Sequence, residues 1–219
     1  IPKKLTCDEE SLTDLYGKFI AEPFERGYGM TIGNSLRRVL LSSIEGAAVT
    51  SMKIDGVLHE FSAIPGVLED GTQIVLNVKQ LVLRAHSRQP KTISIEKDKK
   101  GAVTGADLVV DETIEVVNPD LHLCTLTKAG KFRMEFEVSR GRGYVPAERH
   151  KKEGQAIGVI PVDALFSPVK RVNFSVEDTR VGQVTDYDRL LLEIWTNGSM
   201  SPKDALLYSS HILQRHLDL

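Results

Sequence analysis

A glycine-rich stretch near the amino terminus has residue types that could hold a phosphate. Residues 27–33 are Gly-Tyr-Gly-Met-Thr-Ile-Gly and lead into a stretch with helical spacing. Backbone amides at a helix N-terminus can bind the phosphates of a nucleotide. The glycine spacing differs from the dinucleotide fingerprint, Glu25 and Arg26 stand directly before it, and no strand–helix–strand unit follows. A tight turn into a helix is the simpler interpretation, and a nucleotide-binding enzyme is kept as an alternative.

A second candidate lies at residues 140–146, which are Arg-Gly-Arg-Gly-Tyr-Val-Pro. Arginine forks onto phosphate and glycine lets backbone amides approach it, so Arg140, Arg142 and Arg149 could form a sequence-independent RNA contact. The chain has 28 lysines and arginines against 30 acidic residues, whereas nucleic-acid binders usually carry a basic surplus. The composition therefore favours a plain loop, and an RNA-binding module remains a second alternative.

Metal-binding and hydrolytic chemistry have no visible constellation in this sequence. The six histidines lack HxxxH and HExxH spacing, and His122 with Cys124 is an isolated pair on an expected strand. Cys7 and Cys124 form no CxxC motif, no serine lies in a GxSxG motif, and the carboxylates are scattered. We therefore expect no catalytic residue, no metal site and no cofactor.

Among the elements that would position these residues, a helix over residues 31–44 is the first clear one. Ile32, Leu36, Val39 and Leu40 recur at helical spacing, and Gly46 is expected to close the helix. Two strands are expected before it, at residues 3–7 and 16–23. A further apolar residue of the helix, Leu41, lies opposite Ile32 and is flanked by Arg37 and Arg38. An arginine beside an exposed apolar anchor is typical of an interface, although exposed leucines are common.

The end of the chain resumes the pattern of its beginning. Strands are expected near residues 172–176 and 190–196, followed by a turn at residues 197–198 and a long helix. Ser201 is the expected N-cap, Pro202 the first helical residue and Asp204 the acid of a capping box. The apolar stripe of this helix is too broad for an ordinary surface helix, which favours self-association over a larger core of its own.

The middle of the chain, residues 47–168, is dominated by strand signals. A hairpin is expected across the Asp55-Gly56 turn, with residues 57–61 as its second strand. Residues 132–138 alternate apolar and charged side chains, which predicts a strand with one buried face. A helix is expected over residues 72–79, and residues 96–105 are expected to form a solvated loop.

Composition limits the class of protein. A chain of 219 residues suits one domain with a large insertion or two small domains. The two unpaired cysteines suit a reducing compartment, and no apolar run approaches the roughly 20 residues that span a bilayer. The first residues are not followed by the apolar core of a signal peptide. We therefore expect a cytoplasmic protein.

Several long segments resemble, in order, the hallmarks of the alpha subunit of bacterial and plastid RNA polymerases. They are residues 25–29 (Glu-Arg-Gly-Tyr-Gly), 33–43 (Gly-Asn-Ser-Leu-Arg-Arg-Val-Leu-Leu-Ser-Ser), 54–60 (Ile-Asp-Gly-Val-Leu-His-Glu), 141–147 (Gly-Arg-Gly-Tyr-Val-Pro-Ala), 167–169 (Ser-Pro-Val) and 196–198 (Thr-Asn-Gly). The resemblance covers essentially the whole chain. It implies a location in the bacterial cytoplasm or the plastid stroma.

The resemblance also implies an α+β fold with two domains. Residues 1–46 and 169–219 would form a discontinuous dimerisation domain, a small antiparallel sheet with two helices. Residues 47–168 would form an inserted, mostly β domain that contacts the large subunits. The implied function is a non-catalytic assembly scaffold of DNA-directed RNA polymerase, which forms a homodimer and recruits the beta and then the beta-prime subunit. The chain would count as a nucleotidyltransferase only through that complex.

Site residues follow from the resemblance by position. Arg37, Arg38 and Leu41 would contact the beta subunit. Positional match alone gives the beta-prime contacts as Lys79, Val162, Val169 and Arg189. The expected dimer interface comprises Ile32, Leu36, Val39, Leu40, Ala205, Tyr208, Ile212, Leu213 and Leu217. The family's full subunit continues into a DNA-contacting carboxy-terminal domain, whereas this sequence ends at Leu219, so no direct contact with promoter DNA is expected from it.

Overall fold

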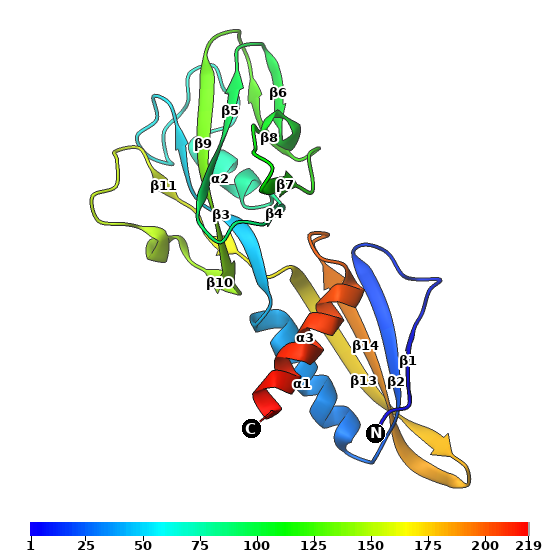
Figure 1. Ribbon diagram of the computed structural model, residues 1–219. Helices are drawn as coiled ribbons and strands as arrows, with labels where there is room; N and C mark the ends of the chain where they lie inside the picture. Colours follow the sequence, from blue (N-terminus) through cyan, green and yellow to red (C-terminus); the bar gives the residue numbers. More distant parts are fainter. Residues whose placement is uncertain (219) are drawn as a thin grey trace. The chain divides into compact units, whose positions relative to one another are not determined.

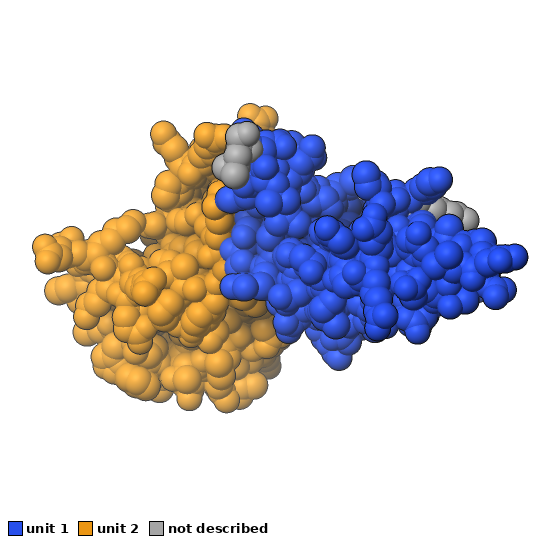
Figure 2. Space-filling view, turned by 90° about the horizontal axis from the view of Figure 1, so that it is seen from below, with its two compact units in different colours: residues 1–44, 167–219 blue, residues 45–166 orange. Residues whose placement is uncertain are grey.

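The structure, a computed structural model, describes residues 1–218 and divides into two compact units (Figures 1 and 2). Unit 1 combines residues 1–44 with residues 167–219, and unit 2 is the continuous stretch 45–166. These boundaries lie two residues from those expected at 46/47 and 168/169. The difference arises because residues 45 and 46 already belong to a strand that pairs within unit 2.

Unit 1 is a four-stranded antiparallel sheet with two helices packed against it (Figure 1). The strand order is β1-β2-β14-β13, so strands from the two ends of the chain lie side by side. The strands are β1 (Lys4–Cys7), β2 (Tyr16–Phe24), β13 (Val169–Val181) and β14 (Val184–Thr196). The helices are α1 (Tyr28–Ser42) and α3 (Pro202–Leu217). Both expected helices and the four expected strands are therefore present.

The core of unit 1 forms where the helices meet one face of the sheet. Leu36 and Leu40 of α1 and Ala205 and Leu206 of α3 pack in one cluster with sheet residues. The sheet contributes the alternate residues of its strands, as expected of an antiparallel sheet covered on one side. These sheet residues are Phe19, Val169, Val172, Leu192 and Ile194.

Unit 2 is built around a six-stranded sheet with one helix. Its path is β5-β9-β3-β4-β7, with β11 paired to β3. These strands are β3 (Glu45–Ile54), β4 (Leu83–Ala85), β5 (Lys91–Lys97), β7 (Ile114–Val116), β9 (Phe132–Arg142) and β11 (Ile160–Pro161). Two small pairs join β6 (Gly101–Thr104) to β8 (His122–Leu126) and β10 (Tyr144–Val145) to β12 (Ala164–Leu165). The helix is α2 (Gly71–Val78), and two short 3-10 turns are η1 (Gly105–Asp107) and η2 (Ala147–His150).

The alternation that predicted a half-buried strand at residues 132–138 is confirmed. Met134, Phe136 and Val138 of β9 are buried in the core of unit 2, while the charged residues between them are only partly buried. The helix expected over residues 72–79 is also present, but it begins and ends one residue earlier, at Gly71 and Val78. It begins there because Asp70 and Gln73 form a capping box, in which each side chain accepts the other's backbone N–H.

Helix α1 differs from its prediction at both ends. It begins at Tyr28 rather than at residue 31 and ends at Ser42, where the Ser43 amide donates to the Val39 carbonyl. Gly46 does not close the helix, because it lies in β3 and pairs with Gly141 of β9. The sequence pattern of α1 thus located the helix but not its termini.

Two predictions for unit 2 are wrong. After the Asp55-Gly56 turn, residues 57–61 form no strand, since β3 pairs with β9 on one side and with β4 and β11 on the other. The segment instead crosses the start of α2, where the Thr72 hydroxyl donates to the Glu60 carbonyl. Residues 96–105 are not one loop: β5 runs through Lys97 and β6 begins at Gly101. Their many polar side chains concealed a strand whose Val103 is fully buried.

Candidate assembly surface

Helix α1 is attached to the sheet at its N-terminus by a carboxylate from the other end of the chain. Oδ2 of Asp188 in β14 accepts the Gly27 amide at 2.9 Å and the Gly29 amide at 3.0 Å. Gly27 has φ 93°, a left-handed conformation that favours glycine. These are the amides that a nucleotide phosphate would need, and a buried carboxylate of the same chain already occupies them. The glycine-rich segment is therefore a turn into the helix, and it offers no phosphate site.

Close packing explains another glycine of the same segment. A Cβ atom at Gly33 would lie 2.7 Å from Phe174 Cδ2 and 2.8 Å from Leu190 Cδ1. Real Cβ contacts do not come that close, so only glycine lets the helix lie this near to β13 and β14. Asp188 and Gly33 together fix how α1 lies on the sheet.

The three residues expected to contact the beta subunit do not form one outward patch. Arg37 and Arg38 are exposed, but Arg37 Nε donates to the Val172 carbonyl at 3.4 Å, over the edge strand β13. Leu41 is partly buried and packs against the core of unit 1. It follows the fully buried Leu40, about 100° further around the helix, so it lies at the border of the buried stripe. Both arginines therefore face solvent, Arg37 beside β13 and Arg38 at the next position of the helix, whereas Leu41 packs toward the core.

The expected dimer residues divide into three groups. Leu36, Leu40 and Ala205 are buried within their own chain, the latter two with no exposed surface. These three side chains can support an interface only by packing behind the residues that form its surface. Ile32, Val39, Ile212 and Leu213 are partly buried on the flanks of the two helices. Tyr208 and Leu217 are largely exposed, at 57% and 69% of their surface.

Three further exposed apolar residues on the helices were not among those expected. They are Tyr28 and Met30 of α1 and Leu207 of α3. Tyr28 lay outside the expected helix, and Met30 precedes the first residue of the periodic pattern. Leu207 could have been found from the sequence, because it is an apolar residue on the side of the helix opposite the buried stripe. The two helices together thus expose Tyr28, Met30, Leu207, Tyr208 and Leu217.

The residues matched to beta-prime contacts are divided between the units. Val162 and Val169 are buried, so neither offers its side chain to a partner directly. In unit 1, Arg189 lies 3.7 Å from Glu22 and 3.8 Å from Glu177 in ion pairs. In unit 2, the Lys79 ammonium lies 2.9 Å from Asp163 Oδ2, and Asp163 follows Val162 in the sequence.

Asp163, which sequence reasoning missed, organises the neighbourhood of Lys79. Its Oδ1 accepts the Ala147 amide at 2.8 Å. The hydrogen bond from Lys79, together with that amide, holds the pKa of the Asp163 carboxyl below its usual value. Partial burial raises the pKa of Tyr144, and the same carboxylate adds to that rise. One carboxylate thus joins the end of α2 to the segment that contains the Arg-Gly-Arg-Gly motif.

That motif is mostly strand rather than loop. Arg140 and Arg142 lie in β9, and the turn to β10 is made at Gly143, where φ is 62°. Arg140 is 3.3 Å from Glu45 Oε2 in an ion pair, while Arg142 and Arg149 are exposed. The three arginines considered for an RNA contact are therefore not equally free to meet a phosphate.

No cluster of three or more potential metal ligands occurs within residues 1–218. His122 Nε2 lies 2.9 Å from Glu69 Oε1, and Glu69 also accepts the Thr125 amide at 2.7 Å. Burial alone would raise the pKa of Glu69, but the hydrogen bonds from His122 and Thr125 outweigh it and leave that pKa lowered. Burial raises the pKa of the Cys124 thiol to about 12.

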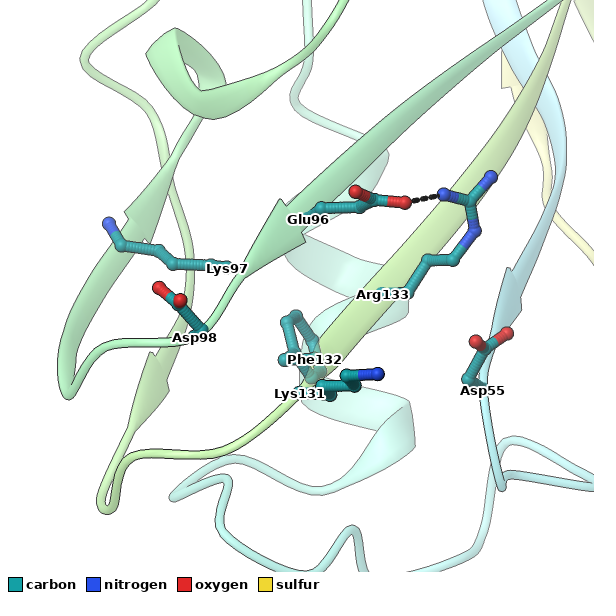
Figure 3. Close-up of a pocket in the computed structure, with 7 residues that line it drawn as sticks. All are labelled: Asp55, Glu96, Lys97, Asp98, Lys131, Phe132 and Arg133. Carbon is teal, nitrogen blue, oxygen red and sulfur yellow. Dashed lines mark hydrogen bonds and ion pairs between the residues drawn. The ribbon is translucent and has the colours of Figure 1, made fainter.

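A polar hollow of about 580 Å³ opens at the ends of β5 and β9 in unit 2 (Figure 3). Its lining residues are Asp55, Glu96, Lys97, Asp98, Lys131, Phe132 and Arg133. Arg133 forms ion pairs with Glu96 and with Glu135, the latter at 2.7 Å. Three acidic and three basic side chains line the hollow, so it has no excess charge to attract an ion.

In the described part of the chain, no helix is long and apolar enough to cross a membrane.

Comparison with known proteins defines the class first. The family model for the RNA polymerase Rpb3/RpoA insert domain matches residues 52–167, which fall almost entirely in unit 2. The matched domain is inserted into the discontinuous α+β unit 1. The chain therefore has the fold of an RNA polymerase subunit with an inserted domain.

Similarity then extends across both units. The chain is 55% identical over 216 residues to the DNA-directed RNA polymerase subunit alpha of Moorella thermoacetica, covering 99% of this chain and 68% of that protein. It is 54% identical to the subunit of Desulfitobacterium hafniense, with 99% and 69% covered, and 57% identical to that of Symbiobacterium thermophilum, with 93% and 65% covered. The chain belongs to the family of bacterial DNA-directed RNA polymerase alpha subunits.

Proposed function

We propose that this chain is a non-catalytic assembly scaffold of DNA-directed RNA polymerase. It forms a homodimer through α1 and α3 of unit 1 and then recruits the beta and beta-prime subunits. The chain takes part in nucleotidyl transfer only as a member of that complex. The proposal for its partners rests on membership of the alpha-subunit family, whose relatives are DNA-directed RNA polymerase subunits.

The observation that supports dimerisation is the exposed apolar surface of the two helices. Tyr28, Met30, Leu207, Tyr208 and Leu217 are each more than half exposed, although both helices already bury a stripe against their own sheet. Exposed apolar side chains gathered on one pair of helices are typical of a protein–protein contact. A second copy of the same helices is the simplest partner, because a two-fold interface needs only one self-complementary surface.

Recruitment of the beta subunit is assigned to Arg38 of α1, with Arg37 and Leu41 beside it. Its guanidinium can form a paired hydrogen bond with a carboxylate or with backbone carbonyls of a partner. In unit 2, the surface around Lys79 and Asp163 is the proposed region of contact with beta-prime. The proposed beta-prime contact would be supported from the core by Val162 and Val169. The proposed dimer interface would be supported in the same way by Leu36, Leu40 and Ala205.

Light scattering at micromolar concentration tests the dimer. We expect about twice the chain mass of 24.3 kDa for the unaltered protein and about that mass itself for Tyr208→Asp. Leu68→Asp is the matched control, because Leu68 is a similarly exposed apolar residue in unit 2. An unaltered chain that remains a monomer would contradict the proposal.

Co-purification tests the partners. A tagged chain mixed with beta should retain it, and the resulting complex should then retain beta-prime. Retention of neither large subunit by a folded dimer would leave dimerisation standing and remove the scaffold function.

A further inference from the structure

The sheet of unit 1 has a second face, which the residues of the core do not use. Side chains alternate between the two faces of a strand, so the neighbours of the buried sheet residues point to the side away from the core. The strand register stacks them in four rows across β2, β14 and β13. The rows are Tyr16, Trp195 and Arg171; Lys18, Glu193 and Asn173; Ile20, Leu191 and Ser175; and Glu22, Arg189 and Glu177.

The first row is an aromatic platform with a cation above it. The Arg171 guanidinium carbon lies 4.8 Å from the centre of the Trp195 ring, and the Tyr16 and Trp195 ring centres are 5.1 Å apart. The Tyr16 hydroxyl donates to Glu193 Oε2 at 2.5 Å, and this hydrogen bond raises the pKa of Tyr16 to about 12. The platform is therefore held in place before any partner arrives. Tryptophan, tyrosine and arginine are the residues that contribute most to binding at protein interfaces.

The third row contains two aliphatic side chains, Ile20 and Leu191, beside Ser175. Ile20 and Leu191 are partly exposed, and they do not belong to the apolar cluster under the helices. This row lies four residues from the first along each strand, a separation of roughly 14 Å at about 3.4 Å per residue. A partner that meets both rows needs an aliphatic side chain at that distance from a second group.

The charges on this face indicate what the second group is. Arg189 in the fourth row is paired with Glu22 and Glu177, and Glu193 in the second row receives the Tyr16 hydroxyl. Arg171 forms no ion pair with any carboxylate among residues 1–218. Lys18 in the second row likewise forms no ion pair among these residues, so this face carries two unpaired positive charges, of which Arg171 lies over the aromatic ring of Trp195.

We propose that this face docks an extended segment of another polypeptide, which places a carboxylate on Arg171 and an aliphatic side chain on Ile20 and Leu191. A carboxylate fits because it can pair with the guanidinium while the ring below shields that pair from water. The proposal concerns the side of the sheet away from α1 and α3, so it does not depend on dimerisation through those helices.

Trp195 provides the measurement, because it is the only tryptophan of the chain. The probe is an acetylated peptide of serine and threonine that carries one glutamate and, four residues later, one leucine. We expect a saturable change in Trp195 emission with a Kd on the order of 1 mM or tighter at low salt. The same peptide with lysine in place of glutamate should bind at least tenfold more weakly. Absence of a saturable change, or equal binding of the two peptides, would overturn the proposal.

Charge reversal makes the test specific. Arg171→Glu should invert the preference so that the lysine peptide binds better, and Arg171→Gln should abolish it. Arg180→Glu is the matched control, since it makes the same charge change further along β13 and should keep the glutamate preference. Ile20→Ser should weaken the binding of both peptides severalfold. A glutamate preference that survives in a folded Arg171→Glu protein would also overturn the proposal, while light scattering on the same samples reports separately on the dimer.

Discussion

The two helices of unit 1 begin in different ways. Helix α3 is capped locally, since the Ser201 hydroxyl accepts the Asp204 amide three residues later at 3.1 Å. Helix α1 has no side-chain cap from its own N-cap residue, and its first amides are bound by Asp188, which is 159 residues from Gly29. A local cap stabilises a helix wherever that helix lies. A cap from β14 stabilises α1 only while the helix rests on the sheet, so it also determines where the helix rests.

Asp188→Ala tests the distant cap and should have the largest effect. The buried Gly29 amide and the less buried Gly27 amide would lose their charged acceptor, and the free energy of unfolding should fall by about 3 kcal/mol. Chemical denaturation with far-UV circular dichroism measures it. Asp186→Ala, an exposed substitution on the same strand, should change little. Equal effects of the two substitutions would mean that α1 needs no cap from the sheet.

Gly33→Ala tests the close approach of α1 to the sheet. The new methyl group would lie within 3 Å of Phe174 and Leu190, which must move to make room. We expect a loss of about 2 kcal/mol from overpacking, despite the better helix propensity of alanine. Asn34→Ala, at the exposed neighbouring position, should be neutral or slightly stabilising. A stabilised Gly33→Ala protein would show that the sheet yields easily beneath the helix.

Ser201→Ala removes the local cap of α3. Loss of one capping hydrogen bond typically costs about 1 kcal/mol, which is less than the distant cap should be worth. Thermal unfolding in parallel with Ser201→Asp measures it, because aspartate keeps a capping oxygen. If Ser201→Ala destabilises the protein more than Asp188→Ala does, the comparison between the two helices is reversed.

Arg38→Ala should have the smallest effect on stability, within about 0.5 kcal/mol, because the side chain is exposed. The variant should remain a dimer by light scattering yet fail to retain beta in a pull-down, since truncating an interface arginine typically costs about 2 kcal/mol of binding. Arg88→Ala, an exposed arginine of unit 2, is the control. Normal retention of beta by Arg38→Ala would remove this residue from the proposed contact.

The contrast between the local cap of α3 and the distant cap of α1 also explains which parts of the fold could be predicted from the sequence. The start of α3 was predicted correctly because Ser201, Pro202 and Asp204 lie within four consecutive residues and each has a local preference for the start of a helix. The start of α1 was predicted three residues late, because the residue that fixes it lies in β14. The second strand of the expected hairpin failed for a similar reason, since β3 pairs with strands that are distant in the sequence.

The candidate site was predictable to a similar extent. Helical spacing placed Arg38 on the solvent side, but it also placed Leu41 there, because periodicity gives an angle and not the edge of the neighbouring sheet. Burial of Val162 and Val169 depends on strand pairing within each unit. Lys79 pairs with Asp163, which lies between β11 and β12, and Arg171 lies over Trp195 of β14; no local pattern joins either pair.

The interrupted layout of unit 1 has a consequence for synthesis of the chain. Unit 2 is continuous, so all of its strands are present once residue 166 has left the ribosome. Unit 1 pairs Tyr16 with Trp195, so β2 must remain unpaired on that side until almost the whole chain has been made. Domains generally fold as units during translation, and distant pairings form late. The inserted unit should therefore fold first, and the surface proposed for dimerisation should be completed last.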